Sequence, residues 1–157
     1  MHSFASSWCP AAGSHPAGLG SAVIAQSYPL DAALDESVKF ARARKAFGKA
    51  IGEFQAIQWM LADMHTEIEA ARGLVYHAAS LKDSGGRMGS AASRAKLYAS
   101  EMANRVVYKA VQIHGSQGYS RESEVERMYR DARVIPIYEG TSEIQRTIIA
   151  RDLFGKS

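Results

Sequence analysis

The 157-residue sequence has one cysteine, four prolines and no long apolar run. The single thiol, Cys9, excludes an internal disulfide, and no group of Cys and His residues has zinc-site spacing, so we expect no metal. The longest apolar stretches are far shorter than a membrane span. Hydrophobic residues make up 46% of the chain and charged residues 22%, which is typical of a globular domain with a substantial core.

Residues 1–30 also lack charge of either sign, since they contain no Lys, Arg, Asp or Glu. They hold three of the four prolines. A secretory signal would begin with a positive segment, and a mitochondrial transit peptide would be rich in Arg. We therefore expect residues 1–30 to form an irregular leader, with at most a short helix over Leu19–Gln26 that Pro29 ends.

The net charge of the chain is only +3, and acidic and basic residues are mixed along it. A nucleic-acid-binding protein usually clusters Lys and Arg on one face, and no such run is present, so we expect no nucleic-acid partner. An anionic small molecule, such as a phosphorylated cofactor, fits a mild basic excess equally well.

From Asp31 onward, apolar residues recur at helical spacing, beginning with "DAALDESVKFARAR". The strongest pattern predicts a helix from about Glu53 to Lys82, because apolar residues alternate at three- and four-residue steps, as in left-handed bundles. We expect Leu61, in the middle of this stripe, to be fully buried. The stripe consists of Phe54, Ile57, Leu61, Met64, Ile68, Ala71, Val75 and Ala78.

A third helix is predicted after the turn "DSGG", and its Ala-rich face lets a partner helix pack closely. Gly115 and Gly118 end this helix. A fourth helix begins near Ser142, which forms a capping box with Gln145. Residues 31–157 are thus predicted to form one all-α domain, an antiparallel four-helix bundle. The face of the third helix consists of Ala92, Ala95, Ala99, Met102, Val106 and Ile113.

Three stretches at helix ends remain after the core is assigned. They are "RARKAFGKAIGEFQ" at 42–55, "QIHGSQGY" at 112–119 and "RVIPIYEGTSEIQR" at 133–146. Helix N-termini and glycine-rich turns suit phosphate groups, although a glycine after a helix is usually only a cap. In the last stretch, Glu139 stands between an apolar run and a glycine, and on position alone it is a solvated acid near a helix N-terminus.

Together with "YRDAR", and in this order and spacing, the three stretches resemble the acyl-CoA dehydrogenase family. The resemblance covers about residues 31–157, corresponds to the family's C-terminal helical domain, and is nearest to short-, medium- or short-branched-chain members. Members are typically tetrameric flavoenzymes that bind FAD, remove the α proton of an acyl-CoA and transfer the β hydride to the flavin. The resemblance implies a homo-oligomer, an electron-transfer flavoprotein as electron acceptor, and a bacterial cytoplasmic or mitochondrial matrix location.

Glu139 matches the family's catalytic base. Burial beside Ile135, Ile137 and Tyr138 is expected to raise its proton affinity, as a base for a weakly acidic C–H bond requires. Gly140 leaves space for the thioester. The backbone amide after the catalytic acid binds the thioester carbonyl in the family, which stabilises enolate-like charge.

The remaining matches are flavin contacts. By resemblance, Arg44 pairs with the FAD pyrophosphate, and a neighbouring subunit's FAD is reached by the loop at 112–116, where Ser116 replaces a usual glycine. Alternatively, Arg44 is an ordinary surface residue and His114 a helix-end cap. Arg130 and Asp131 are expected to form a structural ion pair. The implied flavin contacts are Arg44, Phe47, Gln55, Gln112, Ile113, His114, Gly115, Ser116, Thr141, Ser142 and Glu143.

The family also has an N-terminal helical domain and a middle β domain, which this sequence does not match. The chain therefore resembles a fragment of a larger enzyme. Two functions compete: the C-terminal part of an acyl-CoA dehydrogenase, or a non-catalytic helical bundle that serves only in oligomer assembly. In both cases we expect the chain to self-associate.

Overall fold

The computed structural model describes residues 18–155, with side chains from Leu30 onward, so Cys9 and most of the predicted leader lie outside the described residues. The described chain is helical apart from one two-stranded hairpin, made of β1 (Lys45–Ala46) and β2 (Lys49–Ala50). Two short 3-10 helices, η1 (Ile51–Glu53) and η2 (Gly115–Tyr119), follow the hairpin and the third long helix. The α-helices are α1 (Gly18–Ala43), α2 (Gln55–Asp83), α3 (Gly89–His114), α4 (Glu124–Val134) and α5 (Ser142–Leu153).

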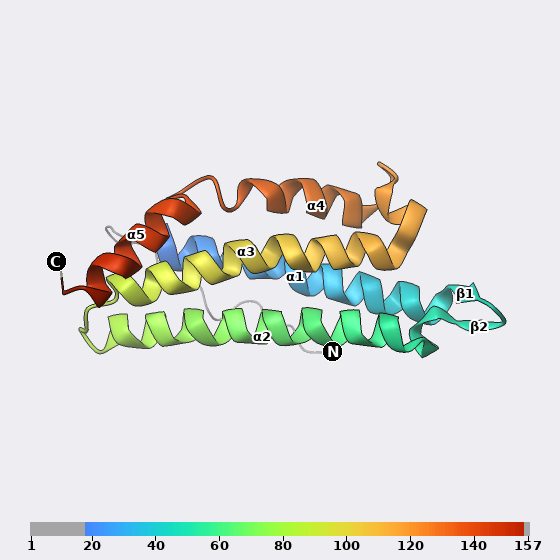
Figure 1. The fold of residues 1–157 in the computed structure, drawn as a ribbon, viewed down its shortest axis with the longest axis horizontal. Coiled ribbons are helices and arrows are strands. Elements are labelled where there is room, and N and C mark those ends of the chain that lie inside the picture. Colours follow the sequence, from blue (N-terminus) through green and yellow to red (C-terminus); the bar gives the residue numbers. More distant parts are fainter. Residues whose placement is uncertain (1–17, 156–157) are drawn as a thin grey trace.

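Three long helices, α1, α2 and α3, lie side by side, and α4 and α5 follow one another along the opposite side of α3 from α2 (Figure 1). Helix α3 contacts α1, α2, α4 and α5. The predicted all-α bundle is confirmed, but two shorter helices, α4 and α5, occupy the position of a single fourth helix. Helix α4 was not predicted, because it is short, mostly charged and has few buried residues, Val125 and Ala132.

The apolar stripes of α2 and α3 form the core, as predicted. The buried residues of α2 are Met64, Ile68, Ala71, Val75 and Ala78, and the predicted face of α3 is buried throughout. The prediction for Leu61 is wrong, because this side chain is only partly buried. Ile57 and Met60 are also partly buried. The core contacts at the start of α2 are therefore divided among Ile57, Met60 and Leu61, and none of the three is fully buried. A straight helix drifts relative to a strict 3.5-residue repeat, which places part of the stripe at the edge of the core.

Helix α1 runs through Pro29, so the prediction that Pro29 ends a short helix is wrong. Proline removes one backbone hydrogen bond in a helix interior and is costly there. Beyond it, Leu30, Ala33 and Ala41 are buried in the core, and the hydroxyl of buried Ser37 donates to the Ala33 carbonyl at 2.7 Å. Packing of this face outweighs the local penalty, because most helix stability in proteins comes from tertiary burial.

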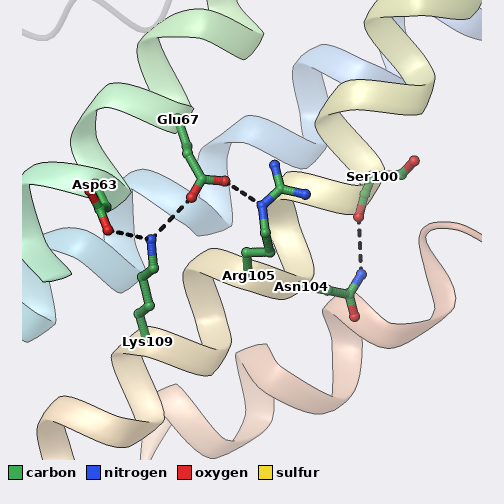
Figure 2. Close-up of polar contacts among 6 residues, drawn as sticks. All are labelled: Asp63, Glu67, Ser100, Asn104, Arg105 and Lys109. Atoms are coloured by element: carbon green, nitrogen blue, oxygen red, sulfur yellow. Dashed lines mark hydrogen bonds and ion pairs between the residues drawn. The ribbon is translucent and has the colours of Figure 1, made fainter.

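Charged residues connect α2 and α3 along one side of the bundle (Figure 2). Glu67 accepts hydrogen bonds from Arg105 Nε at 2.6 Å and from Lys109 Nζ at 3.1 Å, and Lys109 also reaches Asp63 at 3.1 Å. Burial acts to lower the pKa of Lys109, but the hydrogen bonds that its ammonium donates to Asp63 and Glu67, together with the charges of these acids, outweigh burial and raise the pKa. The Glu67 carboxylate therefore holds two cations in one place.

Replacement of Met64 tests the core assignment. Met64 is fully buried, so Met64→Ala should lower the free energy of unfolding by about 2–5 kcal/mol through lost burial and a residual cavity. Met60→Ala removes the same atoms from a partly buried site and should cost less. Chemical denaturation of both variants measures the difference, and equal losses would contradict the assignment.

The charged cluster gives a second test. Glu67→Gln leaves Arg105 and Lys109 without their shared carboxylate and should cost about 1–2 kcal/mol, since hydrogen bonds to charged groups are the stronger ones. Asp63→Asn is the matched control, because the Asp63 side chain is 63% exposed against 19% for Glu67. Exposed pairs contribute little, so thermal unfolding should be nearly unchanged in the control. A larger loss in Asp63→Asn would show that Glu67 is not the centre of the cluster.

Candidate active site

The segment between α4 and α5 holds Glu139 in an uncommon backbone conformation. Glu139 has φ 53°, and Gly140 follows it with φ 93°. Non-glycine residues in this left-handed region cost of order 1–3 kcal/mol and persist only where the surroundings impose them. Such strain concentrates at functional sites, so the backbone singles out Glu139 independently of its side chain.

Hydrogen bonds close the segment on both sides of Glu139. The Ser142 N–H donates to the Pro136 carbonyl at 3.0 Å, and the Gln145 side-chain amide donates to the Gly140 carbonyl at 3.1 Å. A Cβ at Gly140 would clash with that Gln145 nitrogen. The Gly140 N–H takes part in no hydrogen bond within residues 18–155, so it remains available to an acceptor.

The expected burial of Glu139 is wrong for this chain, because its side chain is exposed. Ile135 is buried, but Ile137 is 55% exposed and Tyr138 is 39% exposed. The apolar neighbours named from the sequence are present, yet nothing among the described residues covers them together with the carboxylate. Burial of this acid would need a further surface, from another part of the protein, a second copy or a substrate.

Lys96 of α3 lies beneath the same segment, and sequence reasoning missed it. The residue is 1% exposed, and its Nζ donates to the Ile135 carbonyl at 2.6 Å and lies 5.5 Å from the centre of the Tyr138 ring. Burial lowers the pKa of Lys96, and the charge of Glu139 opposes this shift. The sequence did contain one indication that Lys96 is buried, because Lys96 follows Ala92 by one helical turn and so belongs to the buried face of α3.

The start of α5 differs by one residue from the predicted cap. Thr141 is the N-cap, and its hydroxyl accepts from the Ile144 N–H at 3.4 Å. Ser142 is instead the first helical residue, buried, and among the described residues its hydroxyl has no hydrogen-bond partner. Glu143 is exposed, and its pKa is lowered by a hydrogen bond from its own backbone amide and another from Thr141. Thr141 and Glu143 are therefore accessible beside Glu139, whereas Ser142 is not.

The hairpin after α1 presents the second predicted group. Phe47 and Gly48 form its two-residue turn, both with positive φ (51° and 83°), as hairpin turns of this length favour. Phe47 is 96% exposed and meets Phe54 edge-on at 6.2 Å between ring centres. Arg44 and Gln55, on either side of the hairpin, are also exposed. The Phe47 ring therefore lies outside the core, on the surface at the tip of the hairpin.

The third predicted group lies at the end of α3. Gln112 is exposed, Ile113 is buried in the core, and His114 is half-buried. The His114 ring stacks on Phe40 of α1 at 4.4 Å, and its Nδ1 lies 2.8 Å from the Ala110 carbonyl. This ring therefore joins α1 to α3 in the last turn of α3.

The turn after α3 tolerates a side chain at one position and not at another. Gly115 has φ 59°, whereas Ser116 is exposed and does not adopt positive φ, so the local fold accommodates a serine there. At Gly118 a Cβ would lie 2.7 Å from the Cβ of His114 and 2.8 Å from the Val111 carbonyl. Close packing of η2 on α3 therefore requires glycine at 118 rather than at 116.

The expected pair between Arg130 and Asp131 is wrong. Arg130 Nε instead donates to Glu126 at 2.8 Å, one turn earlier on α4, because residues four apart on a helix share a face and adjacent residues do not. In the described part of the chain, no group of His, Cys, Asp and Glu could hold a metal ion. Over the same residues, no helix combines the length and apolar content needed to cross a membrane.

The predicted residues thus fall into two groups. The hairpin and the end of α3 share one end of the bundle, while the segment with Glu139 lies beside the other half of α3 (Figure 1). Lys96, which touches that segment, and His114 are about 27 Å apart along α3 at 1.5 Å per residue.

A sequence profile described as "Acyl-CoA dehydrogenase, C-terminal domain" matches residues 20–154. The chain belongs to the acyl-CoA dehydrogenase family. It is 56% identical over 124 residues to the CarC subunit of the caffeyl-CoA reductase–Etf complex of Acetobacterium woodii, which covers 79% of this chain and 33% of that protein.

Two solved structures share the fold. Butyryl-CoA dehydrogenase from Megasphaera elsdenii has a TM-score of 0.85 and 42% identity, covering 87% of this chain and 36% of that one. An FAD complex of PigA has a TM-score of 0.82 and 30% identity, covering 86% and 35%. The chain therefore spans about a third of the length of these relatives.

Gly140→Ala tests the strained segment. Alanine is disfavoured at φ 93°, and its Cβ would displace the buried Gln145 amide, so the free energy of unfolding should fall by about 1–2 kcal/mol. Gly73→Ala is the control, because Gly73 is exposed within α2 and has no neighbour in the way. This change should stabilise the helix by roughly 0.5–1 kcal/mol. Denaturant titrations that moved both variants in the same direction would contradict the described backbone.

Proposed function

We propose that this chain forms the C-terminal part of a flavin-dependent acyl-CoA dehydrogenase in which Glu139 is the catalytic base. The single observation that carries the proposal is the conformation of Glu139, a non-glycine residue held at φ 53° beside a glycine and two exposed apolar side chains. A thioester lying over Ile137 and Tyr138 would cover the carboxylate and remove it from water. The exposed acid would then acquire the low-dielectric surroundings that a carbon base requires.

In this reaction a Glu139 carboxylate oxygen takes the α proton. The electron pair of that C–H bond forms the α,β double bond as a hydride leaves the β carbon. The unused Gly140 N–H is a suitable donor to the thioester carbonyl, where negative charge develops. Glu139 would also serve the reverse reaction, the reduction of an unsaturated thioester, since a protonated Glu139 would return a proton to its α carbon. The name of the CarC relative, a reductase, supports keeping both directions open.

A bound FAD would supply the hydride acceptor. The residues present fit such a group: Arg44 offers an exposed cation for a pyrophosphate, and Phe47 offers an exposed ring. Thr141 and Glu143 lie beside Glu139, whose segment contacts Lys96, and Lys96 is about 27 Å along α3 from His114. We infer that the two groups of one chain serve different FAD molecules, so that a homo-oligomer is needed to complete each site.

This chain spans about a third of the length of these relatives. The rest of the site would come from sequence that corresponds to the other two thirds. An electron-transfer flavoprotein is the proposed electron acceptor, and the Etf complex named for the CarC relative supports it. The alternative, a helical bundle that serves only in assembly, is favoured by the exposure of Glu139 in the isolated chain. Visible bands of bound flavin in the absorbance spectrum of the purified chain would favour the enzyme over the assembly module, because a bundle that serves only in assembly binds no flavin.

Glu139→Gln tests the base in a complete enzyme, made by fusing this chain to the N-terminal two thirds of CarC. The amide is nearly isosteric with the acid and Glu139 is exposed, so fold and flavin content should persist. Dehydrogenation should fall about 10²–10⁴-fold, because an amide cannot accept the α proton. Bleaching of the flavin absorbance after addition of acyl-CoA measures the step.

Two further variants sharpen this experiment. Glu122→Gln changes an exposed acid between η2 and α4 and should bleach at the rate of the unmodified fusion. Glu143 is the nearest other acid along the chain. Bleaching that survives in Glu139→Gln and disappears in Glu143→Gln would assign the base to Glu143, and normal bleaching in both would place the base outside this chain.

A further inference from the structure

Lys96 is a charged residue buried among the small residues of α3. It is 1% exposed, on the face of α3 that carries Ala95 and Ala99. Lysine is almost never fully buried unless its ammonium is paired, because removing the charge from water is costly. A side chain that costs this much in the core requires a compensating interaction.

The compensating interaction is with the segment that presents Glu139. The Lys96 ammonium donates to the Ile135 carbonyl at 2.6 Å, a short hydrogen bond of the kind that charged donors make. Ile135 caps the end of α4, where unpaired carbonyls carry partial negative charge. The Tyr138 ring, 5.5 Å from the same nitrogen, adds a cation–π contact. The ammonium thus lies against two residues of one short segment.

This segment needs anchoring at both ends, because Glu139 and Gly140 are held in left-handed conformations. Gln145 of α5 holds one end through the Gly140 carbonyl, and Lys96 of α3 holds the other through the Ile135 carbonyl. Two side chains from different helices therefore enclose the strained residue. Strained backbone persists only where its surroundings over-determine it in this way.

We propose that Lys96 is a positioning residue for Glu139, which fixes the Ile135–Gly140 segment from beneath through the Ile135 carbonyl and the ring of Tyr138, the residue before Glu139. The inference rests on the proposed function only for the catalytic meaning of Glu139. Lys96 acts through this segment and itself touches no reacting atom.

The coupling between the two charges is measurable on the 157-residue chain without flavin or substrate. Burial lowers the pKa of Lys96 and the charge of Glu139 opposes this, so removing that charge should lower the pKa of Lys96 further. We expect the NMR titration of the Lys96 side chain to move to lower pH in Glu139→Gln. All samples carry Tyr138→Phe, which keeps the ring beside the ammonium and removes the phenol as a titrating group.

Glu143→Gln is the matched control for this titration, since it removes an exposed carboxylate four residues further along the chain. It should leave the Lys96 titration where it is. A role for Lys96 in packing alone would also leave the titration unchanged in Glu139→Gln. Identical Lys96 titrations in Glu139→Gln, Glu143→Gln and the parent would therefore overturn the coupling.

The positioning role is tested by Lys96→Met, which keeps the length of the side chain and removes its charge and donor. Amide hydrogen exchange at Ser142, whose N–H closes the segment on the Pro136 carbonyl, should become about tenfold faster or more, as expected for loss of a charged hydrogen bond. Lys109→Met is the control on the same helix, because Lys109 bonds to α2 instead. Equal exchange in the two variants would overturn the positioning role.

The Glu139→Gln titration decides the coupling even where Lys96→Met does not fold, because Glu139 is exposed and its replacement leaves the core intact. Both measurements are also separate from catalysis. Loss of bleaching in the fusion enzyme with an unmoved Lys96 titration would leave Glu139 as the base without this partner. A moved titration with normal bleaching would keep the coupling and reject the base.

Discussion

Burial of α3 on several sides is the constraint on which the rest of the fold depends. Four other helices contact it, and most of its buried positions are small, including Ala92, Ala95, Ala99, Ala103 and Ala110. Small side chains let helix axes approach closely, so the neighbouring helices can pack near the α3 axis. The segment with Glu139 is located in this way, since it spans the gap between two helices that both rest on α3.

Sequence periodicity predicted α2, α3 and the start of α5 because their apolar stripes are long or clearly capped. It missed α4, whose charged surface hides its few buried residues, and it gave too much weight to Pro29, where burial of Leu30 and its neighbours decides the outcome. The signature stretches led to Glu139, but not to its exposure or to Lys96. Both depend on which surfaces meet in three dimensions, and a lysine within an alanine stripe carries no local mark of the carbonyl it will reach.

Among residues 18–155, the two non-glycine residues with positive φ, Phe47 and Glu139, share a pattern. Each is exposed, each belongs to a stretch named from the sequence, and each is followed by a glycine that also has positive φ. Two successive left-handed residues reverse the chain sharply and push the first side chain outward at a corner. The described residues thus place their non-glycine positive φ at the two points where ligand contacts are proposed.

Helix α3 also fixes how the two candidate regions are rotated relative to each other about its axis. Through Lys96 it touches the segment of Glu139, and its last turn carries His114 and leads into Gly115, so one rigid rod sets both the separation and the relative rotation of the two regions. One extra residue between them would lengthen the rod by only about 1.5 Å but rotate one region by about 100° against the other. Insertions and deletions in related sequences should therefore occur in the turn before Gly89 or beyond α5, and not in the interior of α3.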